Sequence, residues 1–157
     1  MRSQPNLGQT PPVDTTVDYL RTRPQPSGLT TSTPRLAGIE RKTFRVKVQL
    51  ITAVMEDDHD FHLVIAPKGA RSHQMIVEFA DPNCNGASSS AKRAAMTRAR
   101  NSFINACGTI GTSFVSLHGT AVLTGVGFFD EIHGQTGIAP NGIELHPVLS
   151  FKSANCH

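Results

Sequence analysis

The chain has 157 residues, 38% of them hydrophobic and 17% charged, which suits one globular domain. Its formal net charge is +3, so it is only mildly basic, which argues against a dedicated nucleic-acid-binding protein. No apolar run is long enough to span a membrane, and the first thirty residues lack the apolar segment of a signal peptide. We therefore expect no membrane span, and either a cytoplasmic location or export of a longer protein from which this N-terminus has been trimmed.

Residues 1–37 are predicted to form a disordered arm. Six of the ten prolines lie there, among many Ser and Thr and few apolar side chains. A segment of this composition cannot bury enough apolar surface to offset the entropy of ordering it. Within the arm, the run from Val17 to Leu20 is a candidate for a short turn that docks on the domain. The barrel domain is predicted over residues 38–153, followed by a tail over 154–157.

Three strands are expected at the start of the domain. From Thr43 to about Met55, apolar side chains alternate with polar ones such as Arg45 and Lys47, which indicates a half-buried strand. The acidic turn 56–60 leads to a second strand over 61–65, which forms a hairpin with the first. A Pro-Lys-Gly turn at 67–69 precedes a third strand over 74–79.

The apolar period then changes to that of a helix. Small and apolar residues from Ala95 to Cys107 share one helical face, Ser88 to Ser90 offer N-caps, and Gly108 is a suitable residue to end the helix. The basic side chains on the other helical faces, including Arg100, are expected to form a solvated surface.

Two further strands complete the pattern. One covers 120–129, where two glycines suggest a bulge, and the other covers 143–151, where Pro147 should lie at an edge or a bulge. The order β-β-β-α-β-β predicts a mostly β protein with one helix, a five-stranded barrel of the OB type. The predicted core residues are Val46, Val48, Leu50, Leu63, Val77, Phe103, Val122 and Leu145.

The region from Val54 to Pro82 resembles the barrel of staphylococcal-nuclease-like proteins. In that family too, an acidic turn (here Glu56-Asp57-Asp58-His59-Asp60) joins the first two strands, and a turn with Asp and Pro ends the third. Acidic residues of that turn bind calcium there, and arginines with a glutamate act on the phosphate. The third strand here has Glu78 but no Arg, and Cys84 stands where the family's glutamate is expected. The resemblance therefore implies the barrel more than the chemistry.

A second resemblance is more specific. The segments His133-Gly134-Gln135-Thr136-Gly137, Ala139-Pro140-Asn141 and Ile143-Glu144-Leu145-His146-Pro147-Val148 are similar to a signature of OB-fold-like bacterial proteins of unassigned function. This resemblance extends over the barrel domain and implies no activity.

Two sets of residues are candidates for a divalent metal, the one cofactor that the sequence suggests. The first is Asp130, His133, Glu144 and His146, since imidazoles with carboxylates suit zinc or iron. The alternative is structural, with Asp130 capping the loop and both histidines hydrogen-bonded within the barrel. The second is Asp58, Asp60 and His62, which alternate along an extended chain. Its alternative is a solvated acidic turn.

The remaining candidate residues concern ligands and the three cysteines. Arg45 and Lys47 on the first strand, with His133 and Asn141 in the Gly-rich loop, are candidates for ligand binding. A Cys84–Cys107 bridge with Cys156 left over and three unpaired thiols are equally compatible with the sequence, and a bridge would imply an oxidising compartment. We assign no catalytic residue.

Three functions remain open. The favoured hypothesis is a non-catalytic OB-fold binding module for an oligonucleotide or an oligosaccharide. The second is a metal-dependent nuclease or phosphodiesterase, in which the metal would supply the positive charge that the barrel lacks. The third is a structural or interaction domain of an exported protein. The loop between the first two strands is acidic, so the usual OB face is poorly suited to bare nucleic acid.

Overall fold

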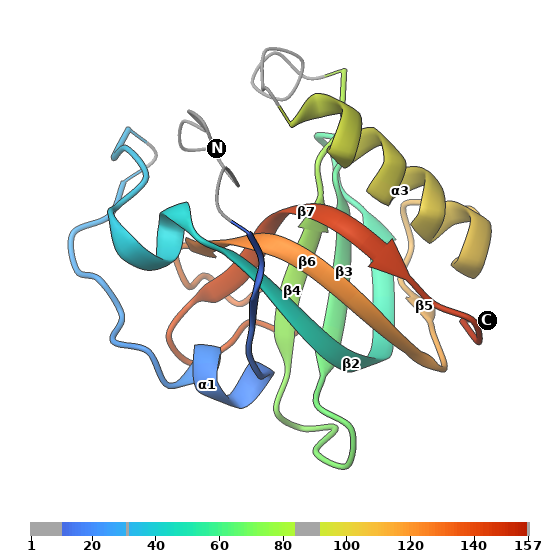
Figure 1. Cartoon of the computed structure of the whole chain (residues 1–157), viewed down its shortest axis with the longest axis horizontal. Helices are drawn as coiled ribbons and strands as arrows, with labels where there is room; N and C mark the ends of the chain where they lie inside the picture. The colour runs from blue at the N-terminus through green and yellow to red at the C-terminus, as the bar shows by residue number, and fades with distance from the viewer. Residues whose placement is uncertain (1–10, 31, 84–91, 157) are drawn as a thin grey trace.

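Five strands form a closed barrel in the computed structural model, which describes residues 11–30, 32–83 and 92–156. They are β2 (Thr43–Met55), β3 (Phe61–Ala66), β4 (Met75–Phe79), β6 (Thr120–Phe129) and β7 (Ile143–Lys152). The order around the barrel is β2-β3-β4-β7-β6, and β6 pairs back onto β2 (Figure 1). The β4–β7 junction is parallel, and the other pairings within the barrel are antiparallel. The predicted OB-type barrel and its element order are confirmed.

The interior follows from the period-two pattern of the strands. Phe44, Val46, Val48 and Leu50 point inward from β2, where each is at most 4% exposed. Val122, predicted to lie in the core, instead points outward, and its neighbours Ala121 and Leu123 are buried. Because both residue sets of β6 are small or apolar, the alternation there does not say which set faces inward.

The bulge predicted from glycines and Pro147 is present. Gly125 pairs with Val148 and Gly127 pairs with Leu145, so β7 has one extra residue between these pairs. A Cβ atom at Gly127 would collide with the Ile39 carbonyl of the 3-10 helix η1 (Gly38–Arg41). Glycine is therefore required where η1 crosses β6.

Helix α3 (Arg93–Cys107) packs against β4 and β7. Phe103 stacks on Phe79 with ring centroids 4.6 Å apart and meets Phe151 edge-on, which joins the helix to the core. Gly108 ends the helix with a φ of 88°. The predicted caps at Ser88 to Ser90 lie outside the described residues. No helix in the described ranges is long and apolar enough to cross a membrane.

A disulfide joins Cys107, at the end of α3, to Cys156 near the C-terminus. Both alternatives that the sequence left open, a Cys84–Cys107 bridge and three unpaired thiols, are therefore wrong. Spacing along the chain could not identify the partner, because it does not show that the tail turns back to the end of the helix. Cys84 itself lies outside the described residues.

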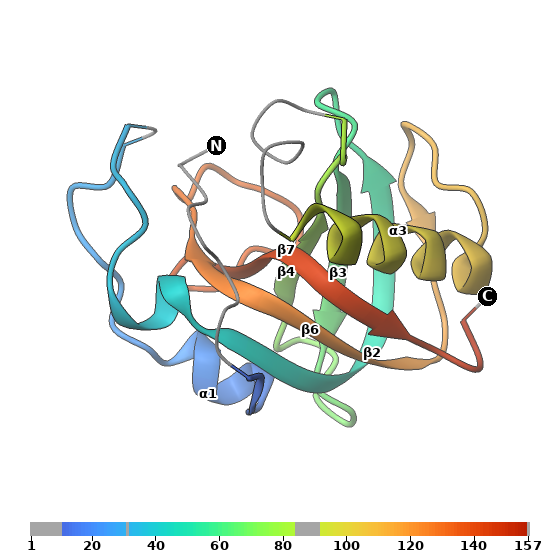
Figure 2. The same cartoon turned by 45° about the horizontal axis from the view of Figure 1, so that its top comes forward.

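The arm is ordered where the structure describes it, contrary to the predicted disorder. Strand β1 (Val13–Asp14) pairs with β2, and the short helix α1 (Val17–Arg21) buries Val17 and Leu20 in the core. The docking predicted for this run is therefore confirmed. The arm and α3 lie on opposite sides of the barrel (Figures 1 and 2). The folded unit consequently begins before residue 38 and includes Cys156, while residues 1–10 lie outside the described ranges.

Candidate metal-binding site

A row of ionisable side chains crosses the outward face of β3, β4 and β7. His62 pairs with Glu78 across the β3–β4 ladder, and the parallel β4–β7 register places Glu78 beside His146. These residues alternate with Leu63, Val77 and Leu145, which point into the barrel. We define the polar cluster as this row with three neighbouring carboxylates: Glu56, Asp60, His62, Glu78, Glu144 and His146.

The polar cluster is covered although it points away from the barrel core. His62, Glu78, Glu144 and His146 are each at most 8% exposed. The loop 130–142 lies over β3, where the Thr136 carbonyl meets the His62 ring and Gly137 packs on Val64. Arg35 of the arm donates hydrogen bonds to the carbonyls of Gly127 on β6 and His146 on β7. The loop and the arm thus form a lid over the face.

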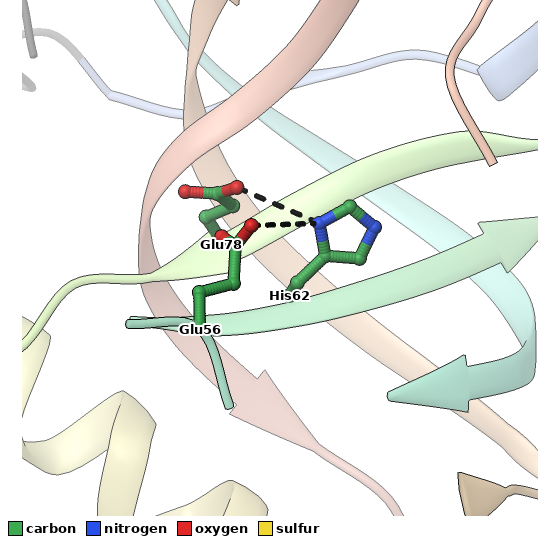
Figure 3. Close-up of side chains that lie close together, drawn as sticks. All are labelled: Glu56, His62 and Glu78. Carbon is green, nitrogen blue, oxygen red and sulfur yellow. Dashed lines mark ion pairs between the residues drawn. The ribbon is translucent and has the colours of Figure 1, made fainter. Parts of the chain in front are cut away.

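At the outer end of the cluster, two carboxylates meet one nitrogen of His62. Glu56 Oε2 and Glu78 Oε1 each lie 3.7 Å from Nδ1 (Figure 3). The other nitrogen, Nε2, lies 2.8 Å from the Thr136 carbonyl oxygen and must donate to it, because a carbonyl oxygen only accepts. In the neutral ring, this bond leaves the lone pair of Nδ1 directed at the two carboxylates. The Glu56 side chain is 38% exposed, so this end reaches solvent.

At the inner end, His146 has a carboxylate on each side. Glu144 Oε1 lies 3.1 Å from Nδ1 and Asp60 Oδ2 lies 3.5 Å from Nε2. The other Asp60 oxygen accepts from the Asp81 N–H at 2.8 Å, which fixes its orientation. His146 Nε2 and Glu144 Oε2 are fully buried and have no hydrogen-bond partner among the described residues. A buried polar atom without a partner is costly, and each calls for a specific explanation.

Glu78 connects the two ends. Its Oε1 faces His62 and its Oε2 lies 3.5 Å from His146 Nδ1. Burial raises the pKa of Glu78 to about 8, although both histidines oppose that rise. Burial also raises the pKa of Glu144. Without a metal, protons therefore reduce the negative charge of the cluster near neutral pH.

The pKa values of the two histidines are raised, although burial by itself would lower them. Burial alone would lower the pKa of His62, but Glu56 and Glu78 outweigh it and raise the pKa to about 10. The pKa of His146 is likewise raised, because Glu78, Asp60 and Glu144 outweigh the effect of burial. The pKa of Glu56 is lowered, chiefly by its interaction with His62. Both histidines therefore carry a proton near neutral pH, which a metal ion bound to their ring nitrogens would displace.

Two groups within the cluster have the spacing of metal ligands. They are Glu56, His62 and Glu78 at the outer end, and Asp60, Glu78 and His146 at the inner end, with ligand atoms within 4.8 Å of one another in each group. Mixed imidazole and carboxylate ligands suit zinc, manganese or iron(II). Metal-binding histidines usually donate their second N–H to a carbonyl or a carboxylate, as His62 and His146 do here.

The predicted metal ligands are only partly brought together. Glu144, His146, Asp60 and His62 lie in the polar cluster, although the sequence had placed them in two separate sets. Asp130 instead accepts hydrogen bonds from the Glu131 N–H and the Gln135 side chain within its own loop. Two further predicted ligands are exposed and lie outside both groups: His133 and Asp58.

The residues predicted to bind ligands are spread over the molecule. Arg45 forms an ion pair with Asp14 of β1 at 2.7 Å. Lys47 lines a shallow groove with Lys68 and Lys152, away from the polar cluster. Asn141 is buried, and its amide donates to the carbonyls of Leu20 and Arg23, which fastens the arm to the loop.

Two residues near the site gave no functional signal in the sequence. Arg35 lies in the arm that was predicted to be disordered, yet it is 2% exposed and its guanidinium packs over the Phe128 ring. Arg100 of α3 was expected on a solvated surface, but it donates to the carbonyls of His59 and Phe79 and covers the Phe61 ring. It thereby holds the turn that carries Asp60. Only the three-dimensional packing identifies either role.

Comparison with known proteins supports the fold. The barrel is similar to part of a protein described as an aspartyl-tRNA synthetase from Leishmania major Friedlin, with a TM-score of 0.52 and 13% sequence identity. The match covers 98% of this chain and 23% of that chain, so this chain spans about a quarter of that protein's length. At this identity the likeness shows the fold alone. No family model and no curated protein matches the sequence.

Proposed function

We propose that this barrel is a binding module whose outward face binds a divalent transition-metal ion. The observation that carries the proposal is the polar cluster, where two histidines and four carboxylates converge under a lid. OB barrels usually bind ligands on the outer face of their second and third strands, between the loops that flank it. In this chain those strands are β3 and β4, and the flanking loops are 56–60 and 130–142.

The lid favours an ion over a polymer on this face. An oligonucleotide or an oligosaccharide needs an open surface, but Val64, Ile76 and His146 point outward and are at most 5% exposed. Strands β3 and β4 also have no exposed aromatic side chain on which a base could stack. An ion needs only neighbouring side chains as ligands, and the cluster supplies two groups with that spacing.

The test is metal binding by the full chain after removal of bound ions with a chelator. Zinc, manganese, iron(II), calcium and magnesium are each titrated by calorimetry, and the metal retained after gel filtration is measured by mass spectrometry. We expect binding of at least one of the first three ions. Bound metal at 100 times its dissociation constant should stabilise the fold by about 2.7 kcal/mol.

A matched pair of histidine variants localises the ion. His146→Gln should weaken binding at least about 100-fold, because it removes the imidazole ligand that Glu144 orients. His133→Gln is the control, since His133 is exposed and outside the cluster. The proposal fails if the wild-type chain binds none of the five ions, or if the His133 variant loses binding as strongly as the His146 variant.

Metal-dependent hydrolysis of a phosphodiester is a second candidate function, and the exposure of Glu56 favours it. A catalytic metal needs a position open to water, and the outer end of the cluster supplies one. Bis(p-nitrophenyl) phosphate is a suitable first substrate. Turnover that requires added metal and disappears in Glu56→Gln would support hydrolysis, and no turnover with any ion bound would exclude it for this substrate.

A further inference from the structure

We infer that the polar cluster holds a pair of metal ions bridged by Glu78, and that the outer ion takes a small oxyanion from solution. This inference rests on the proposed function. It adds the number of ions, the residue that joins them and the class of ligand that the outer ion accepts.

The two carboxylate oxygens of Glu78 face different histidines. Oε1 lies 3.7 Å from His62 Nδ1, and Oε2 lies 3.5 Å from His146 Nδ1. Each metal-spaced group contains Glu78, and the rest of their members differ. A carboxylate that offers one oxygen to each of two ions is the usual link in centres with ions about 3.5–4 Å apart. Neither metal-spaced group of the described residues contains both histidines, so a single ion would leave one of them unused.

Each histidine has a separate outer partner. The Thr136 carbonyl holds His62 Nε2 at 2.8 Å, so Nδ1 is available to the outer ion. Glu144 Oε1 holds His146 Nδ1 at 3.1 Å, so Nε2 is available to the inner ion beside Asp60. Glu78 reaches this ion as the third member of the group, whose ligand atoms lie within 4.8 Å of one another. His146 Nε2 is also buried and without a hydrogen-bond partner among the described residues. Because each imidazole is oriented by its own partner, each can serve as a ligand to a separate ion.

The two positions differ in their access to solvent. Asp60 and His146 have side chains at most 7% exposed, so the inner ion is enclosed. The outer ion has Glu56, with a side chain 38% exposed, and next to it Phe114, whose ring meets the His62 ring edge-on at 6.1 Å. An enclosed ion supports structure, whereas an open position binds water or an anionic oxygen from solution. Inorganic phosphate is the probe for this position.

The test counts ions in single-site variants. The wild-type chain should bind two manganese or zinc ions. Glu56→Gln and Asp60→Asn should each bind one, and Glu78→Gln should weaken both sites. Asp58→Asn is the matched control, because Asp58 belongs to the same acidic turn but to neither group. Circular dichroism establishes that each variant is folded.

Electron paramagnetic resonance of the manganese-loaded protein provides a second measurement. The wild-type chain should show a spin-coupled pair, and Glu56→Gln should show a single isolated ion. Phosphate should perturb the spectrum of the wild-type and Asp60→Asn proteins but not that of Glu56→Gln.

The outcomes separate this inference from the proposed function. Binding of no ion overturns both. Binding of one ion by the wild-type chain overturns the pair and leaves the proposed function standing. Two ions without spin coupling overturn the Glu78 bridge, and a pair insensitive to phosphate overturns the oxyanion site.

Discussion

Strands β3, β4 and β7 bury side chains on both of their faces. The inward residues Leu63, Val77 and Leu145 are 0% exposed, and the outward residues His62 and Glu78 are 4% and 8% exposed. The inner face is stabilised by removal of apolar surface from water, about 25 cal/mol per Å². On the outer face, attraction between charges must offset their desolvation, so the net gain is small. Nearly equal burial thus contributes much stability on the inner face and little on the outer face.

The largest effect is expected for a change at Phe103 of α3, which packs against the inner face. Phe103→Ala should lower the free energy of unfolding by about 3–5 kcal/mol, because the ring lies between Phe61, Phe79 and Phe151. Phe114→Ala is the matched control, since that ring is 49% exposed and its loss should cost less than about 1 kcal/mol. Urea unfolding measures both. Equal losses for the two variants would contradict the assignment of Phe103 to the core.

The pH dependence of stability should come from the outer face. The folded-state pKa of His62 is raised to about 10 and that of Glu78 to about 8, both above their unfolded values. The stability that protonated His62 contributes is therefore complete below about pH 6.5 and is lost as the pH rises toward 10. Glu78 acts in the same direction, because its charged form is disfavoured in the fold.

We expect the metal-free protein to lose about 1–3 kcal/mol between pH 6.5 and 9.5 in urea titrations. Phe103→Ala should lower the free energy of unfolding at every pH but leave its dependence on pH unchanged. The double variant His62→Asn/Glu78→Gln should reduce that pH dependence. A wild-type stability that rises over this range would show that the cluster is not protonated as described.

An effect of similar size is expected for the lid over the outer face. Gly137 has a φ of 83°, and a Cβ atom there would meet the Val64 side chain at 2.6 Å. Gly137→Ala should lower the free energy of unfolding by about 1–3 kcal/mol and speed metal exchange, because the loop is displaced from β3. Gly134→Ala is the matched control, with a φ of 85° and no atom within 4 Å. Gly134→Ala adds backbone strain without a steric collision, so it should leave the rate of metal exchange unchanged. Identical exchange rates in both variants would show that the loop does not gate the site.

The inner face was predictable from the sequence where apolar and polar residues alternate strictly, as they do from Phe44 to Leu50 of β2. The members of the outer face were partly predictable: polar residues at alternating positions indicated Asp60, His62, Glu144 and His146. Their partners were not, because the His62–Glu78 pairing depends on strand register and the Glu78–His146 contact on the β4–β7 junction. Composition also failed for the arm, where single residues such as Leu20 and Arg35 are buried within a proline-rich segment.

The β4–β7 junction should also make the site a late product of folding. Glu78 and His146 are neighbours in space, but α3 and β6 lie between them in the chain. The β2–β3 hairpin can form locally and carries Glu56, Asp60 and His62, whereas contacts distant in sequence form more slowly. A chain that has formed only this hairpin has three of the five proposed ligands. The appearance of tight metal binding during refolding should therefore time the closure of the barrel.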